Sequence, residues 1–154
     1  MRRLAVLGFL WGVACFNPVQ ETTRPFKEAA RAREAGKWAG QYVFGECAGN
    51  GQCWRYEIAV TTDGDAFMTV IGDPKPLRMN LKPRVHQDAL DMSFVSYADE
   101  GVDPSDVGFG VLDPLRGRFS PNQRLGTVTR GPSGSCFVFE SLESKLGSKM
   151  VCTR

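Results

Sequence analysis

The chain has 154 residues, the size of a single domain with one hydrophobic core. Its 19 basic and 17 acidic side chains give a formal net charge of +2, and the charges balance once Arg2 and Arg3 are set aside. Nucleic-acid binding depends on an excess of positive charge facing phosphates. The balanced charge therefore excludes nucleic acid as the expected partner.

The N-terminus has the pattern of a secretory signal peptide. Arg2 and Arg3 precede an apolar run from Leu4 to Ala14, and small residues stand at Gly12 and Ala14. The run is too short to cross a bilayer, which needs about 20 apolar residues. We expect residues 1–14 to be a signal peptide that is cut before Cys15; a buried N-terminal element is the alternative.

The residues before Cys15 resemble a bacterial lipobox, although Gly12 stands where that motif usually has leucine. The resemblance implies that Cys15 is a lipid anchor, and two or more acyl chains would hold the protein stably on a membrane. The expected location is then the periplasm or the outer membrane, to which the lipoprotein is tethered. Plain secretion stays open as the alternative.

The other four cysteines form an even set, as expected for an exported disulfide-bonded domain. Cys47 and Cys53 flank an Asn-Gly turn signal, and Cys136 and Cys152 flank a second expected hairpin. We expect the pairs 47–53 and 136–152. Zinc is not expected, because the Cys-x5-Cys spacing has no histidine nearby and His86 is the only histidine.

One helix and a series of strands follow. Residues 15–22 have the composition of a tether, and residues 23–35 predict a helix with Thr23 as its cap and Pro25 in its first turn. From Trp38 onward, apolar residues alternate with polar ones at period two, which is typical of half-buried strands. Strands are expected near residues 38–47, 53–60, 66–71, 76–82, 90–97, 107–112, 124–129, 135–140 and 149–153.

Short strands at this regular spacing predict an all-β fold. We expect a small antiparallel barrel of eight or nine strands with one N-terminal helix, forming a single domain over residues 23–154. Gly36-Lys37-Trp38 resembles the opening of lipocalin-like barrels, and Trp38–Glu46 with Phe94–Asp99 is similar to small exported bacterial β-domains of unknown function. These resemblances imply the fold and the compartment, and they name no substrate.

Two basic runs are candidate binding surfaces. Arg78 and Lys82 share the wet face of one strand, flanked by Lys75 and Arg84. A second run contains Arg116, Arg118, Arg124 and Arg130. Side by side, they would form a patch for an anionic glycan, a lipid head group or an acidic protein. An ordinary charged barrel exterior is the alternative.

A Gly/Ser loop is the other candidate surface. Ser133-Gly134-Ser135 resembles the Ser-Gly-Ser loop of periplasmic C-type lysozyme inhibitors, which insert that loop into the acidic cleft of the enzyme. Cys136 replaces the glycine that follows in that family. The resemblance implies binding roles for Ser133 and Ser135, with Arg130 beside them; a plain hairpin turn is the alternative.

Catalytic patterns are weak in this sequence. His86 is expected in a loop without a nucleophile motif, Glu46 and Glu57 could face each other across the first hairpin, and the acidic stretch Asp99–Asp106 does not have EF-hand spacing. We expect no catalytic residue, cofactor or metal. The expected function is a monomeric, exported binding or inhibitor protein of the cell envelope; the alternatives are a lipocalin-like carrier of an apolar molecule and an envelope enzyme.

Overall fold

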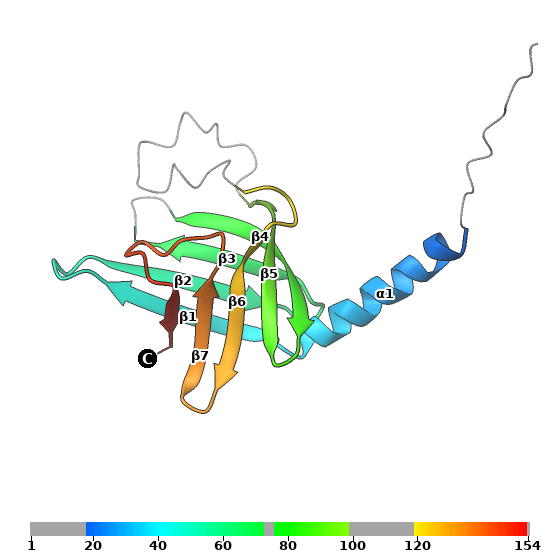
Figure 1. The fold of residues 1–154 in the computed structure, drawn as a ribbon, viewed down its shortest axis with the longest axis horizontal. Helices are drawn as coiled ribbons and strands as arrows, with labels where there is room; N and C mark the ends of the chain where they lie inside the picture. Colours follow the sequence, from blue (N-terminus) through cyan, green and yellow to red (C-terminus); the bar gives the residue numbers. More distant parts are fainter. Residues whose placement is uncertain (1–17, 73–75, 99–118, 154) are drawn as a thin grey trace, which may run out of the picture.

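The structure, a computed structural model, describes residues 18–72, 76–98 and 119–153, with side chains from residue 23 onward. One helix precedes an eight-stranded antiparallel sheet whose strands pair in chain order (Figure 1). The elements are α1 (Pro18–Gly36), β1 (Gly40–Cys47), β2 (Cys53–Val60), β3 (Ala66–Ile71), β4 (Leu77–His86), β5 (Ala89–Tyr97), β6 (Arg124–Gly131), β7 (Gly134–Phe139) and β8 (Met150–Cys152). The all-β prediction with one N-terminal helix is confirmed.

Several expected features lie outside the described residues. They are the signal peptide, Cys15, Lys75, the acidic stretch 99–106, the strand expected at 107–112, and Arg116 and Arg118.

The sheet curls into a nearly closed barrel, and the period-two alternation sets its inside. Along β2, Trp54, Tyr56, Ile58 and Val60 are buried while Arg55 is exposed. The same alternation runs through β4, where Leu77, Met79 and Leu81 are buried. Large side chains from several strands fill the described interior; Tyr56, Phe44 and Phe137 are each at most 1% exposed. Burial of these apolar faces is the main stabilisation of the barrel.

Within the described residues no strand ladder joins β1 to β8, and side chains of β1 close the barrel on that side. Tyr42 accepts a hydrogen bond from Arg130 of β6. The ring of Phe44 lies 6.0 Å from that of Phe137 on β7. Glu46 accepts a 3.0 Å hydrogen bond from Ser144, which follows β7. Successive inward positions of β1 thus contact successive parts of the last third of the chain; we call this contact the seam.

Glu46 is the buried charge at one end of the seam, and it is only 7% exposed. Its carboxylate accepts hydrogen bonds from the Tyr56 hydroxyl at 2.6 Å and from the Leu146 backbone N–H at 3.3 Å, besides Ser144. The Tyr56 hydroxyl in turn accepts from the Lys145 N–H at 2.8 Å. A buried carboxylate needs such donors to offset its lost hydration, so the network fixes the segment between β7 and β8 against β1 and β2.

The helix is longer than the sequence suggested. It begins at Pro18, whose fixed φ suits a first helical position, so residues 18–22 of the expected tether are helical. Thr23 and Pro25 lie inside the helix and not at its start. Phe26 is 77% exposed, whereas Ala35 near the C-terminal end is buried. The helix therefore packs on the barrel by its last turns and projects away from it (Figure 1).

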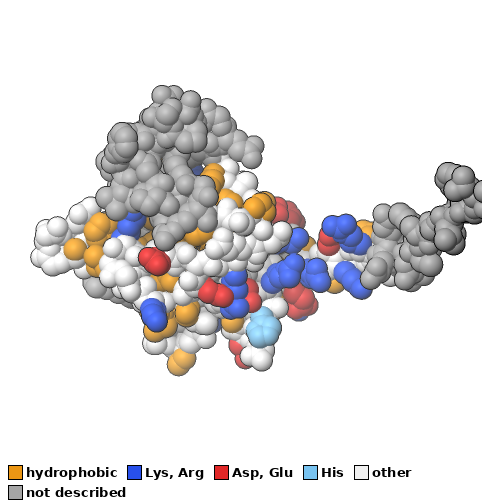
Figure 2. Space-filling view, turned by 45° about the horizontal axis from the view of Figure 1, so that its top comes forward, with side chains coloured by type: hydrophobic (Ala, Val, Ile, Leu, Met, Phe, Trp, Pro, Cys, Tyr) orange, Lys and Arg blue, Asp and Glu red, His pale blue; other side chains and the backbone are white. Residues whose placement is uncertain are grey.

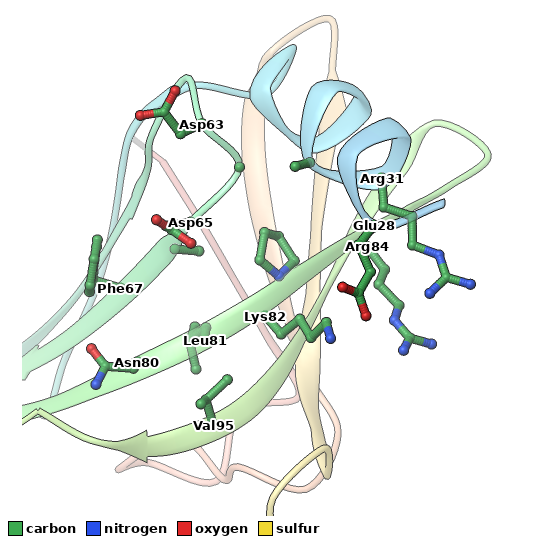
Figure 3. A pocket seen from close by; sticks show the side chains of 14 residues that line it. Glu28, Arg31, Asp63, Asp65, Phe67, Asn80, Leu81, Lys82, Arg84 and Val95 are labelled. Carbon is green, nitrogen blue, oxygen red and sulfur yellow. The ribbon is translucent and has the colours of Figure 1, made fainter. Parts of the chain in front are cut away.

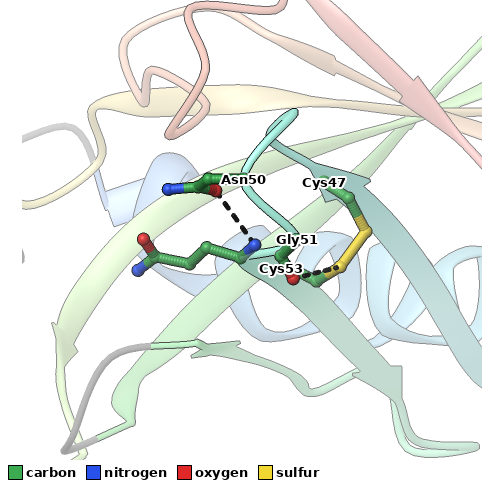
Figure 4. The surroundings of a disulfide bond; sticks show 5 residues. Cys47, Asn50, Gly51 and Cys53 are labelled. Atoms are coloured by element: carbon green, nitrogen blue, oxygen red, sulfur yellow. Dashed lines mark hydrogen bonds between the residues drawn. A yellow bond between two sulfur atoms is a disulfide. The ribbon is translucent and has the colours of Figure 1, made fainter.

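Both disulfides form as predicted. Cys47 and Cys53 lie opposite each other at the end of the β1–β2 hairpin, where the Asn50 side chain accepts a 3.0 Å hydrogen bond from the Gln52 N–H (Figure 4). Cys136 and Cys152 lie opposite each other on β7 and β8. The second bond pins β8, which is only three residues long.

We expect the two disulfides to contribute unequally. They separate their cysteines by 6 and 16 residues, and the chain-entropy model then gives about 2 and about 3 kcal/mol. Cys136→Ser with Cys152→Ser should therefore lower the urea midpoint more than Cys47→Ser with Cys53→Ser. Equal midpoints for the two double variants would contradict this ranking.

Tyr56→Phe should destabilise the barrel by about 1.5–3 kcal/mol, because it removes a hydrogen bond to a buried charge. It also removes the acceptor of the Lys145 N–H. The control is Glu57→Gln on the outer face, which breaks a 2.8 Å ion pair with Arg55 and should cost about 0.2–1 kcal/mol. Chemical denaturation measures both; a Tyr56→Phe cost no larger than that of the control would show that the network is not important for stability.

Candidate functional site

Two glycines seat the C-terminal part of α1 on the turn between β2 and β3. A Cβ atom on Gly64 would lie 2.5 Å from the carbonyl oxygen of Ala32, and one on Gly36 would meet the backbone of Thr62. Gly64 also has a φ of +85°, which disfavours other residues. Helix and turn therefore approach each other backbone to backbone, and this contact sets where the exposed side of α1 stands over the sheet.

A groove of about 520 Å³ runs between α1, the β2–β3 turn and the outer face of β3, β4 and β5 (Figure 3). At one end Arg31 of α1 and Lys82 and Arg84 of β4 lie close together. Asp63 and Asp65 of the turn line the wall across from these cations, because Asp65 directly precedes Ala66, which pairs with Leu81 beside Lys82. This end of the groove therefore has two walls of opposite charge.

The positive end continues along the helix. Arg24, Lys27 and Arg31 of α1 line one hollow together with Lys82 and Arg84 of β4, and we call these five cations the basic cluster. Glu28 is the one carboxylate that lines the same hollow, and it pairs with Arg24 at 3.3 Å. The other four cations form no ion pair within the described ranges. Figure 2 shows basic side chains along α1 and where it meets the barrel.

The opposite end of the groove is apolar. Phe67 on β3, which pairs with Asn80 of β4, and Val95 on β5 are each 44% exposed there. Asn80 pairs with Ser96 and Leu81 with Phe94, so Val95 is the extra residue of a β-bulge. A bulge re-aims a side chain, which accounts for an exposed valine on this part of the barrel.

The structure separates the two basic runs of the sequence. Arg78, Lys82 and Arg84 share the outer face of β4, as expected. Arg124 on β6 is instead paired with Asp91 and with Glu140, at 2.8 Å each. Because β5 lies between β4 and β6, the described residues of the two runs do not form one strand-to-strand patch.

The residues of the Gly/Ser loop occupy the β6–β7 hairpin. Ser133 is exposed in the turn, and the backbone of Ser135 is bonded to Thr153 in both directions, at 2.8 and 3.0 Å. The guanidinium of Arg130 lies 4.2 Å from the ring centroid of Trp38. Arg130 therefore has a packing role at the start of β1, while Ser133 is free to contact a partner.

The expected loop position of His86 is wrong, and the possible pairing of Glu46 with Glu57 does not occur. His86 is the last residue of β4 and not a loop residue. Glu46 lies opposite Trp54 and Glu57 opposite Val43, so the two carboxylates do not face each other. Strand alternation places Glu46 inside the barrel and Glu57 outside.

The helix cations were missed as binding residues in the sequence. Their signal was present, because Arg24, Lys27 and Arg31 follow each other at spacings of three and four and so share one face of a helix. That this face lies over β4 depends on the glycine contacts, which join residues far apart in the chain.

Comparisons with known proteins find no matching family model, no matching curated protein and no matching solved structure. Among the described residues, no helix has the length and apolar character that a membrane span needs. The same part of the chain holds no group of three or more His, Cys, Asp or Glu side chains placed to bind a metal ion.

Gly64→Ala should loosen α1 from the barrel. The new methyl group collides with Ala32, and the left-handed backbone costs a further 1–2 kcal/mol or so. We expect faster hydrogen exchange in the last turns of α1 and unchanged exchange in β5 to β7. Gly49→Ala is the control, because a Cβ there meets nothing within 4 Å; equal effects of the two substitutions would show that the glycine contact does not seat the helix.

Proposed function

We propose that this protein is an exported, non-catalytic binding protein of the cell envelope that uses the basic cluster to bind an anionic partner macromolecule. We place it in the periplasm or, through a lipid on Cys15, at the outer membrane. The two disulfides fit an oxidising compartment of this kind.

The observation that carries the proposal is the convergence of five cations from two elements on one hollow that holds a single carboxylate. Like charges held across a gap repel one another, and water and salt reduce this repulsion without removing it. An anionic group between α1 and β4 would replace the repulsion by attraction. Arginine also gives directional, two-pronged hydrogen bonds to carboxylates and phosphates.

The character of the groove favours binding of a macromolecule over transport or catalysis. A carrier would hold its ligand inside the barrel, where Phe44, Tyr56 and Phe137 occupy the described interior. The groove lies on the outside, and its open cationic wall continues along a projecting helix. An extended exterior surface of this kind suits a large partner better than a small substrate.

The role of the basic cluster can be tested by capture from cell-envelope extract on the immobilised mature protein. Arg31→Glu with Arg84→Glu should lower the amount of retained partner at least about tenfold, a loss of about 1.4 kcal/mol. Added salt should weaken capture by the unchanged protein, since exposed charges are screened beyond about 8 Å at physiological ionic strength.

Arg33→Glu with Lys149→Glu is the matched control, because it changes the net charge equally at exposed positions that do not line the groove. Capture by the control should equal that of the unchanged protein. An equal loss in both double variants would mean that net charge, and not the basic cluster, retains the partner, and the proposal would fail.

A further inference from the structure

We propose that the groove between α1 and β4 binds an extended peptide segment of a protein partner, with acidic residues at the basic cluster, apolar residues on Phe67 and Val95, and a basic residue at Asp63 and Asp65. This inference rests on the proposed function and names the class of the anionic partner as protein.

The apolar end of the groove argues against a partner that is only a polyanion. Phe67 and Val95 expose 44% of their surface beside the basic cluster. A glycan chain that carries phosphate or sulfate groups would leave Phe67 and Val95 in contact with water. Apolar side chains of a peptide would instead remove the apolar surface of Phe67 and Val95 from water. The bulge that directs Val95 outward enlarges the apolar surface at this point.

The acidic wall across from the basic cluster discriminates further. Asp63 and Asp65 are exposed, and neither forms an ion pair within the described part of the chain. The turn that carries them is fixed, because the Asp65 N–H donates to the Thr61 hydroxyl at 3.0 Å and its carbonyl accepts from the Thr61 N–H at 2.8 Å. A uniformly anionic chain or membrane surface would be repelled here, whereas a basic residue of a peptide would be attracted.

The dimensions suit an extended segment. Asn80, Lys82 and Arg84 follow each other on the outer face of β4, and a rise of about 3.3 Å per residue sets Asn80 and Arg84 about 13 Å apart. An extended peptide has the same rise, so about four or five of its residues would lie along this part of the groove. The volume of about 520 Å³ lies within the range of about 300–1,000 Å³ that is usual for ligand sites.

Binding of labelled synthetic peptides to the intact mature protein, followed by fluorescence anisotropy, tests the inference. One peptide carries leucine and phenylalanine, then alternating glutamates and lysines, whose side chains point to opposite sides of an extended chain. The second has the same composition with its apolar residues interleaved among the charged ones, and the third has serine in place of its apolar residues. Only the first peptide should bind tightly. Dextran sulfate, a polyanion without apolar groups, is measured in parallel to test the basic cluster alone.

Two double variants separate the parts of the groove. Phe67→Ser with Val95→Ser should weaken the first peptide about tenfold and leave dextran sulfate binding unchanged. Arg31→Glu with Arg84→Glu should weaken both ligands. The control, Val43→Ser with Val138→Ser, alters valines that are 39% and 36% exposed elsewhere on the barrel and should weaken neither. Thermal unfolding checks that each variant is folded.

The outcomes distinguish the two proposals. If the first peptide binds no better than its interleaved form, or if the Phe67 and Val95 changes leave its affinity unaltered, the peptide inference is overturned. Dextran sulfate binding that still depends on Arg31 and Arg84 would then leave the proposed function standing. If neither ligand binds, both proposals fail. Tighter binding to phosphatidylglycerol vesicles than to the first peptide would overturn the peptide inference in favour of a membrane surface.

Discussion

The hydrogen-bonded carboxylate of Glu46 is the interaction on which closure of the barrel most depends. The strand ladder runs from β1 to β8, and on the remaining side β1 meets the end of the chain through side chains. Glu46 gathers Tyr56 of β2 with Ser144 and the Leu146 N–H from the segment after β7. In a low-dielectric interior these hydrogen bonds are strong, and a buried polar group without a hydrogen-bond partner costs free energy. These bonds therefore hold β1 and β2 against the segment between β7 and β8.

The opposite end of the seam controls where the helix leaves the barrel. Arg130 lies over Trp38 and donates to the Tyr42 hydroxyl, which itself donates to the Trp38 carbonyl at 2.7 Å. Trp38 stands two residues after the end of α1, and its N–H bonds back to the Ala35 carbonyl at 2.9 Å. A contact within the barrel wall thus fixes the base of a helix that carries part of the basic cluster. The closure of the barrel and the geometry of the groove are linked through Trp38.

Local patterns predicted the strands and disulfides, because alternation and turn residues act over a few positions. The role of Glu46 was not predicted. Its position in phase with Trp38, Tyr42 and Phe44 is a local signal for the inner face, but its hydrogen-bond partner Ser144 lies 98 residues away. On α1, the small residue Ala35 makes the contact with the barrel, while the large apolar Phe26 is exposed. The strand face with Lys82 was predicted, but the groove was not, because packing of α1 on a distant turn creates it.

The glycine contact between α1 and the β2–β3 turn also has a consequence for how this surface can change. Its spacing is set by main-chain atoms of Gly36, Thr62, Ala32 and Gly64, not by the groups that face the solvent. The width of the groove is therefore decoupled from the chemistry of its walls. Substitutions at positions such as Arg31, Lys82 or Phe67 can alter polarity and shape while the frame stays constant, so the scaffold can acquire new preferences without being refolded.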